Sequence, residues 1–241
     1  MKLSVLIPAF NEEKLLRECL WSVRGALKAC ARPGWESEVV VCDNDSTDAT
    51  AAIAREEGAK VVFEPHRQIS RARNAAAAAA AGGWLLFIDA DSVLSPGVLE
   101  EMFETAESGR IVGGGCLIAF DFMPGAVRFA VRLWNLISRT LKWAAGSFVF
   151  CRADAFRDVG GFSGALYAAE EIALSMALKR WGRTRGLGFA ILSRGRHLSS
   201  GRKASLYTFR ELLSVILRLV VSPRDTLKSP EALFHLYDRR R

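Results

Sequence analysis

The sequence predicts an α/β protein built around a mixed, mostly parallel sheet. Short apolar runs that favour strands alternate with stretches of helical spacing through residues 2–91, and this order predicts βαβ units. Three of the apolar runs end in polar or acidic residues, at 9–12, 43–48 and 89–91. Because parallel strands end at one edge of a sheet, these residues should line the edge where ligands bind in open α/β sheets.

The first elements are two strand–helix units and a third strand. A strand over residues 2–7 should stop at Pro8, and Asn11 is expected to cap the helix that follows, since its side chain can accept a first-turn N–H. The second strand, over 38–42, ends in Asp43 and leads into a helix over 49–57. A third short strand is expected over residues 60–64.

An alanine-rich helix is expected next, from Ser70 through residues 75–81, and its small side chains permit close packing on a sheet. Five apolar residues then precede Asp89 and Asp91, the pattern of a strand buried on both faces that ends in two carboxylates. Such oxygen ligands suit a hard divalent cation that retains waters and binds phosphate. A turn and helix cap, with Ser95-Pro96 opening the next helix, is the alternative interpretation.

The second half has a different character. A glycine-rich strand is expected over residues 111–122, and a basic amphipathic helix over 127–143 could belong to the core or lie at a membrane interface. A strand over 146–151 and a short helix follow, and Glu170-Glu171 opens a longer helix. After a strand over 189–192 we expect a polar, basic loop over 197–203 and an amphipathic helix over 206–221.

Composition limits the classes of protein. Half of the 241 residues are hydrophobic, the five cysteines form no C-x-x-C pair, and the N-terminus lacks a signal-peptide layout, which together favour a globular cytoplasmic protein. The net charge of +7 divides into +11 for residues 179–241 (15 Lys and Arg, 4 Asp and Glu) and −4 for the remainder. The basic end suggests an anionic partner, but no nucleic-acid module accompanies it. Dinucleotide-binding and P-loop glycine motifs are absent.

The motifs together resemble glycosyltransferase family 2, over about residues 2–205. They are Val5 to Glu12, Asp43 to Thr50, Ala72-Arg73-Asn74, Asp89-Ala90-Asp91, Arg152 with Phe156 and Gly160-Gly161-Phe162, and Glu170-Glu171. The resemblance implies a GT-A fold, a three-layer sandwich, for a catalytic domain at 1–205, with a basic C-terminal helix and tail at 206–241. It also implies metal-dependent, inverting transfer of a sugar from a nucleoside diphosphate, with UDP favoured, to an acceptor hydroxyl, in cell-envelope or polysaccharide synthesis.

The resemblance also implies roles for individual residues. Asp43 would bind the base, Arg73 would lie near the base or diphosphate, and Asp89 would face the ribose. Asp91 would bind Mg²⁺ or Mn²⁺, which neutralises the leaving diphosphate, and His197 is a further candidate ligand for the metal or diphosphate. The remaining donor-site residues are Pro8, Ala9, Asn11, Glu12 and Ala90.

Inversion requires a carboxylate base on the acceptor side, and the family places a Glu-Asp pair there. Here the pair is Glu170-Glu171, so Glu171 occupies the Asp position, and either it or Glu170 serves as the base. The acidic residue usual two positions later is Ala173. An added methylene moves the carboxylate by about 1.5 Å, and errors of about 1 Å can lower a rate about 100-fold.

Two other classes remain open at this stage. A nucleotidyltransferase also uses a strand-end carboxylate pair and a metal, but it usually has a glycine-rich basic loop after its first strand, which residues 8–13 lack. A non-catalytic nucleotide-binding scaffold of the same fold is compatible with the departures at Glu171 and Ala173. The expected partners are a nucleotide sugar and a glycan or lipid-linked acceptor, with peripheral membrane contact through the basic C-terminal segment.

Overall fold

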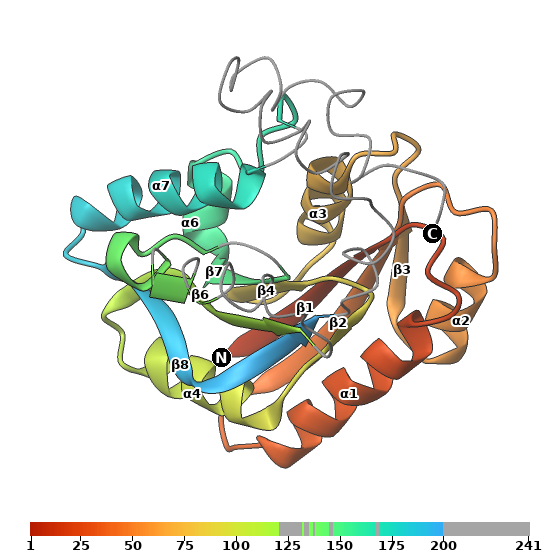
Figure 1. Cartoon of the computed structure of the whole chain (residues 1–241), viewed down its shortest axis with the longest axis horizontal. Coiled ribbons are helices and arrows are strands. Elements are labelled where there is room, and N and C mark those ends of the chain that lie inside the picture. Colours follow the sequence, from red (N-terminus) through yellow and green to blue (C-terminus); the bar gives the residue numbers. More distant parts are fainter. Residues whose placement is uncertain (121–131, 133–134, 137, 145–146, 167–168, 200–241) are drawn as a thin grey trace.

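The computed structural model describes residues 1–120, 132, 135–136, 138–144, 147–166 and 169–199. Within these ranges eight strands form one sheet in the order β3-β2-β1-β4-β7-β6-β8-β5. Helices cover both faces of the sheet (Figure 1), so the α/β class and the three-layer arrangement expected from the sequence are confirmed.

The first half of the chain supplies the parallel part of the sheet. Strands β1 to β4 all run in one direction, with β1 between β2 and β4. The elements are β1 (Lys2–Ala9), α1 (Leu16–Ala29), β2 (Glu36–Asp43), α2 (Thr50–Glu56), β3 (Lys60–Phe63), α3 (Ile69–Ala78) and β4 (Trp84–Ile88).

The second half makes the sheet mixed. Strand β7 runs antiparallel to both β4 and β6, β8 runs parallel to β6, and the two-residue strand β5 pairs antiparallel with β8. The elements are β5 (Ser92–Val93), α4 (Pro96–Glu107), β6 (Ile111–Phe120), β7 (Phe148–Arg152), α6 (Ala153–Asp158), α7 (Glu170–Arg183) and β8 (Gly188–Ser199).

Two apolar clusters hold the layers together. Alternate residues of β1 point to opposite faces, so Leu3, Val5 and Ile7 pack with α1, α2 and α4, whereas Leu6 packs with α3, α6 and α7. Strand β4 is buried at every position, as its unbroken apolar run predicts. The acidic residues that follow β4 are thereby held at the edge of a rigid sheet.

Two local expectations near the first strand are wrong. Pro8 lies within β1, opposite Cys42 of β2; the ladder between β1 and β4 ends at Leu6 and Phe87, so proline's missing N–H is tolerated there. Asn11 does not cap α1, whose N-cap is Leu15. It adopts a left-handed conformation with φ of 52°, which Asn tolerates better than most residues.

The described residues test the membrane-related expectations only in part. No helix among the described ranges is both long and apolar enough to cross a bilayer. The expected helix over 206–221 and the tail lie outside the described residues, as do residues 127–131, 133–134 and 137 of the amphipathic stretch 127–143.

Candidate functional site

The predicted convergence of strand ends is present in the structure. Ala9 and Asp43, the last residues of β1 and β2, pair with each other, and Asp89 directly follows β4, the other neighbour of β1. Ala90 and Asp91 come next in a turn and are buried. The carboxyl edge of the sheet therefore carries Asp43, Asp89 and Asp91, as the sequence indicated.

The predicted donor-site residues of the β1 loop connect it to the loop after β2. The Asn11 side-chain oxygen accepts the Thr47 N–H at 2.8 Å, and the Glu12 N–H donates to the Thr50 hydroxyl at 2.8 Å. Asp43 is buried, and its Oδ1 accepts the Ser46 N–H at 3.0 Å. These contacts fix two adjacent loops as one wall, to which Pro8 and Ala9 contribute buried residues.

Arg73, on α3, joins the two groups of acidic residues that the sequence placed on the donor and acceptor sides. One guanidinium nitrogen donates to Glu170 at 3.0 Å and to Glu171 at 2.9 Å, and the other donates to Asp89 at 3.1 Å. The guanidinium lies 5.2 Å from the centre of the Phe162 ring. At 2% exposure, Arg73 is a buried connection between β4 and the start of α7.

Charge and burial set the protonation of this cluster. Burial acts to lower the pKa of Arg73, but the charges of Glu171, Asp89 and Glu170 outweigh it and raise that pKa. Burial raises the pKa of Glu170 to about 7, and the Glu171 charge adds to this rise against the opposing effect of Arg73. A carboxyl group that titrates near neutrality is a candidate for proton transfer.

Asn74 of α3 and Gln68, the N-cap of that helix, had no role assigned from the sequence, and both hold the segment before Glu170. Asn74 forms paired hydrogen bonds with the Phe162 backbone, donating to its C=O at 2.9 Å and accepting its N–H at 3.0 Å. Gln68, 4% exposed, donates to the carbonyls of Gly164 and Leu166. The Asn in Ala72-Arg73-Asn74 was at least part of a motif, but nothing in the sequence distinguished Gln68.

A further contact at this edge joins two residues of the quoted motifs, Phe10 and Asp45, to Arg67, which had no sequence signal. The Arg67 guanidinium lies 4.8 Å from the centre of the Phe10 ring and forms an ion pair with Asp45 at 2.9 Å. Phe10 follows β1, Asp45 follows β2 and Arg67 precedes α3. The group therefore closes the gap between three loops at the same edge as Asp43.

His197 does not lie in a loop, as the sequence suggested, but in strand β8. The side chain is 2% exposed, and neither ring nitrogen has a hydrogen-bond partner among the described residues. Its ring centre lies 5.4 Å from that of Phe148. Burial lowers the pKa of His197 to about 4, against the opposing effect of the Asp89 charge. The imidazole is therefore neutral at pH 7, the state that binds metals.

The Asp91 carboxylate and the His197 imidazole are groups of the kinds that bind metal ions. Within the described ranges, no group of three or more His, Cys, Asp or Glu residues could hold a metal ion. Strand β5 begins one residue after Asp91 and pairs with β8 immediately after His197, so both residues belong to neighbouring segments. Two protein ligands suffice for Mg²⁺ or Mn²⁺ when phosphate oxygens and waters complete the shell.

Comparison with protein families shows where this architecture recurs. The model described as Glycosyl transferase family 2 matches residues 4–157, more than half of the chain. The protein of Mycobacterium tuberculosis (strain ATCC 25618 / H37Rv) named "Uncharacterized glycosyltransferase Rv0539" is 32% identical over 140 residues, which cover 56% of this chain and 60% of that protein. The chain spans between 19% and 60% of the length of the first curated relatives it matches.

Solved structures share the fold across nearly the whole chain. S. aureus TarS 1–349 in complex with UDP-GlcNAc has a TM-score of 0.62 at 20% identity, covering 98% of this chain and 69% of that one. The mannosyltransferase PcManGT from Pyrobaculum calidifontis, in complex with GDP-Man and Mn²⁺, has a TM-score of 0.66 at 18% identity, covering 98% and 70%. At these identities the likeness concerns the fold, and it confirms the GT-A architecture expected from the motifs.

Proposed function

The chain belongs to glycosyl transferase family 2, and from this premise we propose that it transfers a sugar from a nucleoside diphosphate to an acceptor hydroxyl with inversion. The observation that carries the proposal is the cluster in which Arg73 joins Asp89, beside the donor edge, to Glu170 and Glu171. Donor-side and acceptor-side acidic groups thereby meet at one place, as a direct displacement requires.

The donor site is proposed at the carboxyl edge of the sheet. Asp43, with the wall formed by Pro8, Ala9, Asn11 and Glu12, would hold the nucleoside, and Asp89 and Ala90 would lie at the ribose. Asp91 and His197 would hold Mg²⁺ or Mn²⁺, which neutralises charge on the departing diphosphate when bound. The complexes of structural neighbours with UDP-GlcNAc and with GDP-Man and Mn²⁺ support a nucleotide-sugar donor. UDP is our first choice of nucleotide and GDP the second.

Glu171 is the proposed base. Its side chain is 13% exposed, against 4% for Glu170, so an acceptor hydroxyl can approach Glu171 more easily. The hydroxyl would give its proton to the Glu171 carboxylate while its oxygen bonds to the anomeric carbon and the bond from that carbon to the diphosphate breaks. Arg73 would orient the carboxylate by its hydrogen bond at 2.9 Å.

One observation favours a second candidate function. Arg73 contacts both acceptor-side carboxylates, and an ion pair makes a carboxylate a weaker base. Together with Ala173, this arrangement suits a protein that binds a nucleotide sugar without transferring the sugar. If the protein is such a scaffold, the wild type with Glu171 intact should bind the nucleotide sugar without turnover.

Titration calorimetry of UDP, GDP and their sugar conjugates, with and without Mn²⁺, tests the donor site. We expect metal-dependent binding in the wild type that Asp91→Ala abolishes. Asp154→Ala serves as a matched control, because Asp154 pairs with Arg152 on the surface. Absence of binding for every nucleotide would contradict the proposal. Binding without sugar transfer to any acceptor tested would favour the scaffold.

The division into domains and the acceptor side are also proposals. We place the catalytic domain at residues 1–205 and assign the basic segment 206–241 to contact with an anionic membrane surface, where a lipid-linked acceptor would reside. The excess of cationic residues at 179–241 supports this assignment. A glycan acceptor of the cell envelope is compatible with the same site.

A further inference from the structure

Strand β8 departs from its regular register shortly before His197. Leu192 pairs with Cys116 of β6, but His197 pairs with the residue two positions later, Ile118. Residues 193–196 therefore lie opposite residue 117 alone, which makes an unusually long bulge. Bulges bend a strand and redirect side chains, and they occur often beside active sites.

The bulge determines the face on which His197 lies. In an unbroken strand, residues five positions apart point to opposite faces of the sheet. After the bulge, pairing resumes at Ile118, which points to the same face as Cys116 because the two are two positions apart. His197 pairs with Ile118 and Leu192 pairs with Cys116, so His197 lies on the same face as Leu192. Leu192 and Phe148 belong to one core cluster, and the His197 ring packs against Phe148. Without the bulge, the imidazole would face the other layer.

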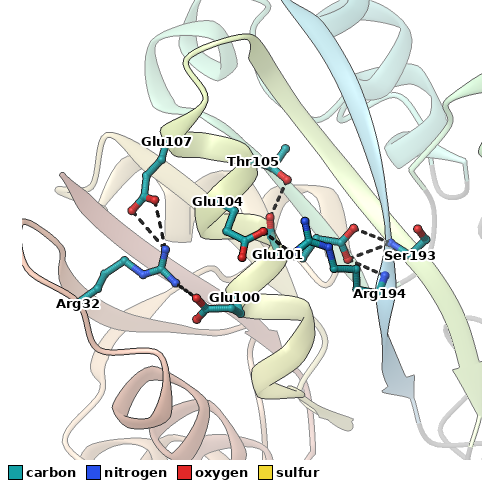
Figure 2. Close-up of polar contacts among 8 residues, drawn as sticks. All are labelled: Arg32, Glu100, Glu101, Glu104, Thr105, Glu107, Ser193 and Arg194. Carbon is teal, nitrogen blue, oxygen red and sulfur yellow. Dashed lines mark hydrogen bonds and ion pairs between the residues drawn. The ribbon is translucent and has the colours of Figure 1, made fainter.

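A single carboxylate on α4 accepts the first two backbone N–H groups of this bulge (Figure 2). Glu101 accepts the Ser193 N–H with both oxygens, at 3.1 and 3.0 Å, and the Arg194 N–H at 2.8 Å. These N–H groups belong to the residues that β6 does not pair. The carboxylate supplies acceptors that the sheet cannot, and charge-assisted hydrogen bonds of this kind are stronger than neutral ones.

Close packing fixes the bulge against the same helix. A Cβ atom at Gly195 would lie 2.6 Å from Val98 Cγ2 and 2.8 Å from the Val98 nitrogen, so only glycine allows this approach. The Arg194 side chain forms an ion pair with Glu104, one turn after Glu101. That pair is exposed and holds a side chain, whereas Glu101 holds the backbone.

We propose that Glu101 is a positioning residue for His197: by holding the Ser193–Arg196 bulge on α4, it orients the imidazole toward the metal of the donor site. The proposal rests on the proposed function, in which His197 is a metal ligand. Glu101 lies outside the site and contacts none of the acidic residues of the cluster around Arg73. Its effect is transmitted through the backbone.

Amide hydrogen exchange tests the contact without any ligand. In the full chain we expect slow exchange of the Ser193 and Arg194 amides, lost in Glu101→Ala and largely kept in Glu101→Gln, whose carbonyl oxygen still accepts. Glu104→Gln is the matched control and should leave both amides protected. Unchanged protection in Glu101→Ala would overturn the proposal.

Electron paramagnetic resonance of bound Mn²⁺ in the presence of UDP tests the consequence. We expect nitrogen couplings from one imidazole in the wild type, weakened in Glu101→Ala and retained in Glu101→Gln and Glu104→Gln. Mn²⁺ affinity should fall about 10-fold in Glu101→Ala, the loss typical of residues that orient a metal ligand. Gly195→Ala, which displaces the bulge by another route, should give the same spectrum.

The outcomes separate this inference from the function on which it rests. Wild-type protein that binds Mn²⁺ and UDP without imidazole coupling would overturn the metal role of His197 and the inference, while leaving the donor site at Asp91 intact. Imidazole coupling and Mn²⁺ affinity that are unchanged in Glu101→Ala would overturn the inference alone. Thermal unfolding of each variant distinguishes a local effect from loss of the fold.

Discussion

Arg73 shows how one residue can combine stability with function. Its guanidinium is almost fully buried and faces Asp89, Glu170 and Glu171, so the cluster contains more carboxylates than cations. The surplus negative charge has to be reduced by protonation or by a bound cation. Glu170 takes the first route, since its pKa is raised to about 7.

Substitution of the two glutamates should separate their roles. Glu171→Gln removes the proposed base, and we expect kcat to fall by about 10²- to 10⁴-fold, the range for loss of general-base catalysis. Binding of the nucleotide diphosphate should change little. Glu170→Gln should lower kcat less, because the Glu170 side chain is more deeply buried and its role is the contact with Arg73. A fall in kcat that is larger for Glu170→Gln would transfer the role of base to Glu170; steady-state kinetics provides the measurement.

The raised pKa of Glu170 also predicts a dependence of stability on pH. Between the ordinary glutamate pKa of 4.5 and the raised value of about 7, the folded protein binds more protons at Glu170 than the unfolded chain does. Stability therefore falls as pH rises through this window. In urea titrations, the free energy of unfolding of the wild type should be lower at pH 8 than at pH 5. Glu170→Gln should reduce this difference by about 1–3 kcal/mol. An equal loss in both proteins would show that Glu170 is charged throughout.

Helix α3, together with its N-cap Gln68, holds the segment proposed for the acceptor side. Gln68, Asn74 and Arg73 contact successive parts of the segment 162–171, through backbone groups first and then through the two carboxylates. Its small residues Ala72 and Ala76 are fully buried against the sheet, which allows the helix to lie close. Alanine repetition therefore reflects packing, as the sequence suggested.

Glycines in β6 provide a prediction at the same scale. A Cβ atom at Gly114 would lie 2.2 Å from the Ala190 carbonyl oxygen and 2.8 Å from the Phe150 ring. We expect Gly114→Ala to lower the free energy of unfolding by about 1–3 kcal/mol, the usual cost of overpacking. Gly83→Ala is the control, since nothing lies within 4 Å of its Cβ position. Equal stability of the two variants in urea titrations would contradict this account of the glycine-rich strand.

Elements were predictable where one physical signal dominated. The apolar run Trp84–Ile88 became β4, and the acidic residues after β1, β2 and β4 share an edge because parallel strands end together. Pro8 and Asn11 were mispredicted because tertiary pairing decided their conformations. His197 was misplaced because the bulge in β8 depends on Glu101, 92 residues from Ser193, and no local pattern encodes such a contact. The same holds for Arg73 and Glu170, 97 residues apart.

At the scale of the whole molecule, charge divides along the chain. Residues 1–178, which contain the proposed donor and acceptor residues up to Glu171, have a balance of −4, and residues 179–241 have +11. A basic C-terminal segment of this charge would be attracted to an anionic bilayer, since each Lys or Arg near such a membrane contributes about 1 kcal/mol.

Vesicle flotation tests this attraction with the full chain. We expect the protein to float with vesicles that contain phosphatidylserine at low salt, and to be released at high salt because screening weakens attraction between exposed charges. Vesicles of phosphatidylcholine alone should not bind it. Replacement of Arg239, Arg240 and Arg241 by serine removes three charges and should reduce flotation, whereas Arg17→Ser, on the opposite half of the sequence, should not. Failure to float with anionic vesicles at low salt would contradict membrane contact and leave soluble glycans as the proposed acceptors.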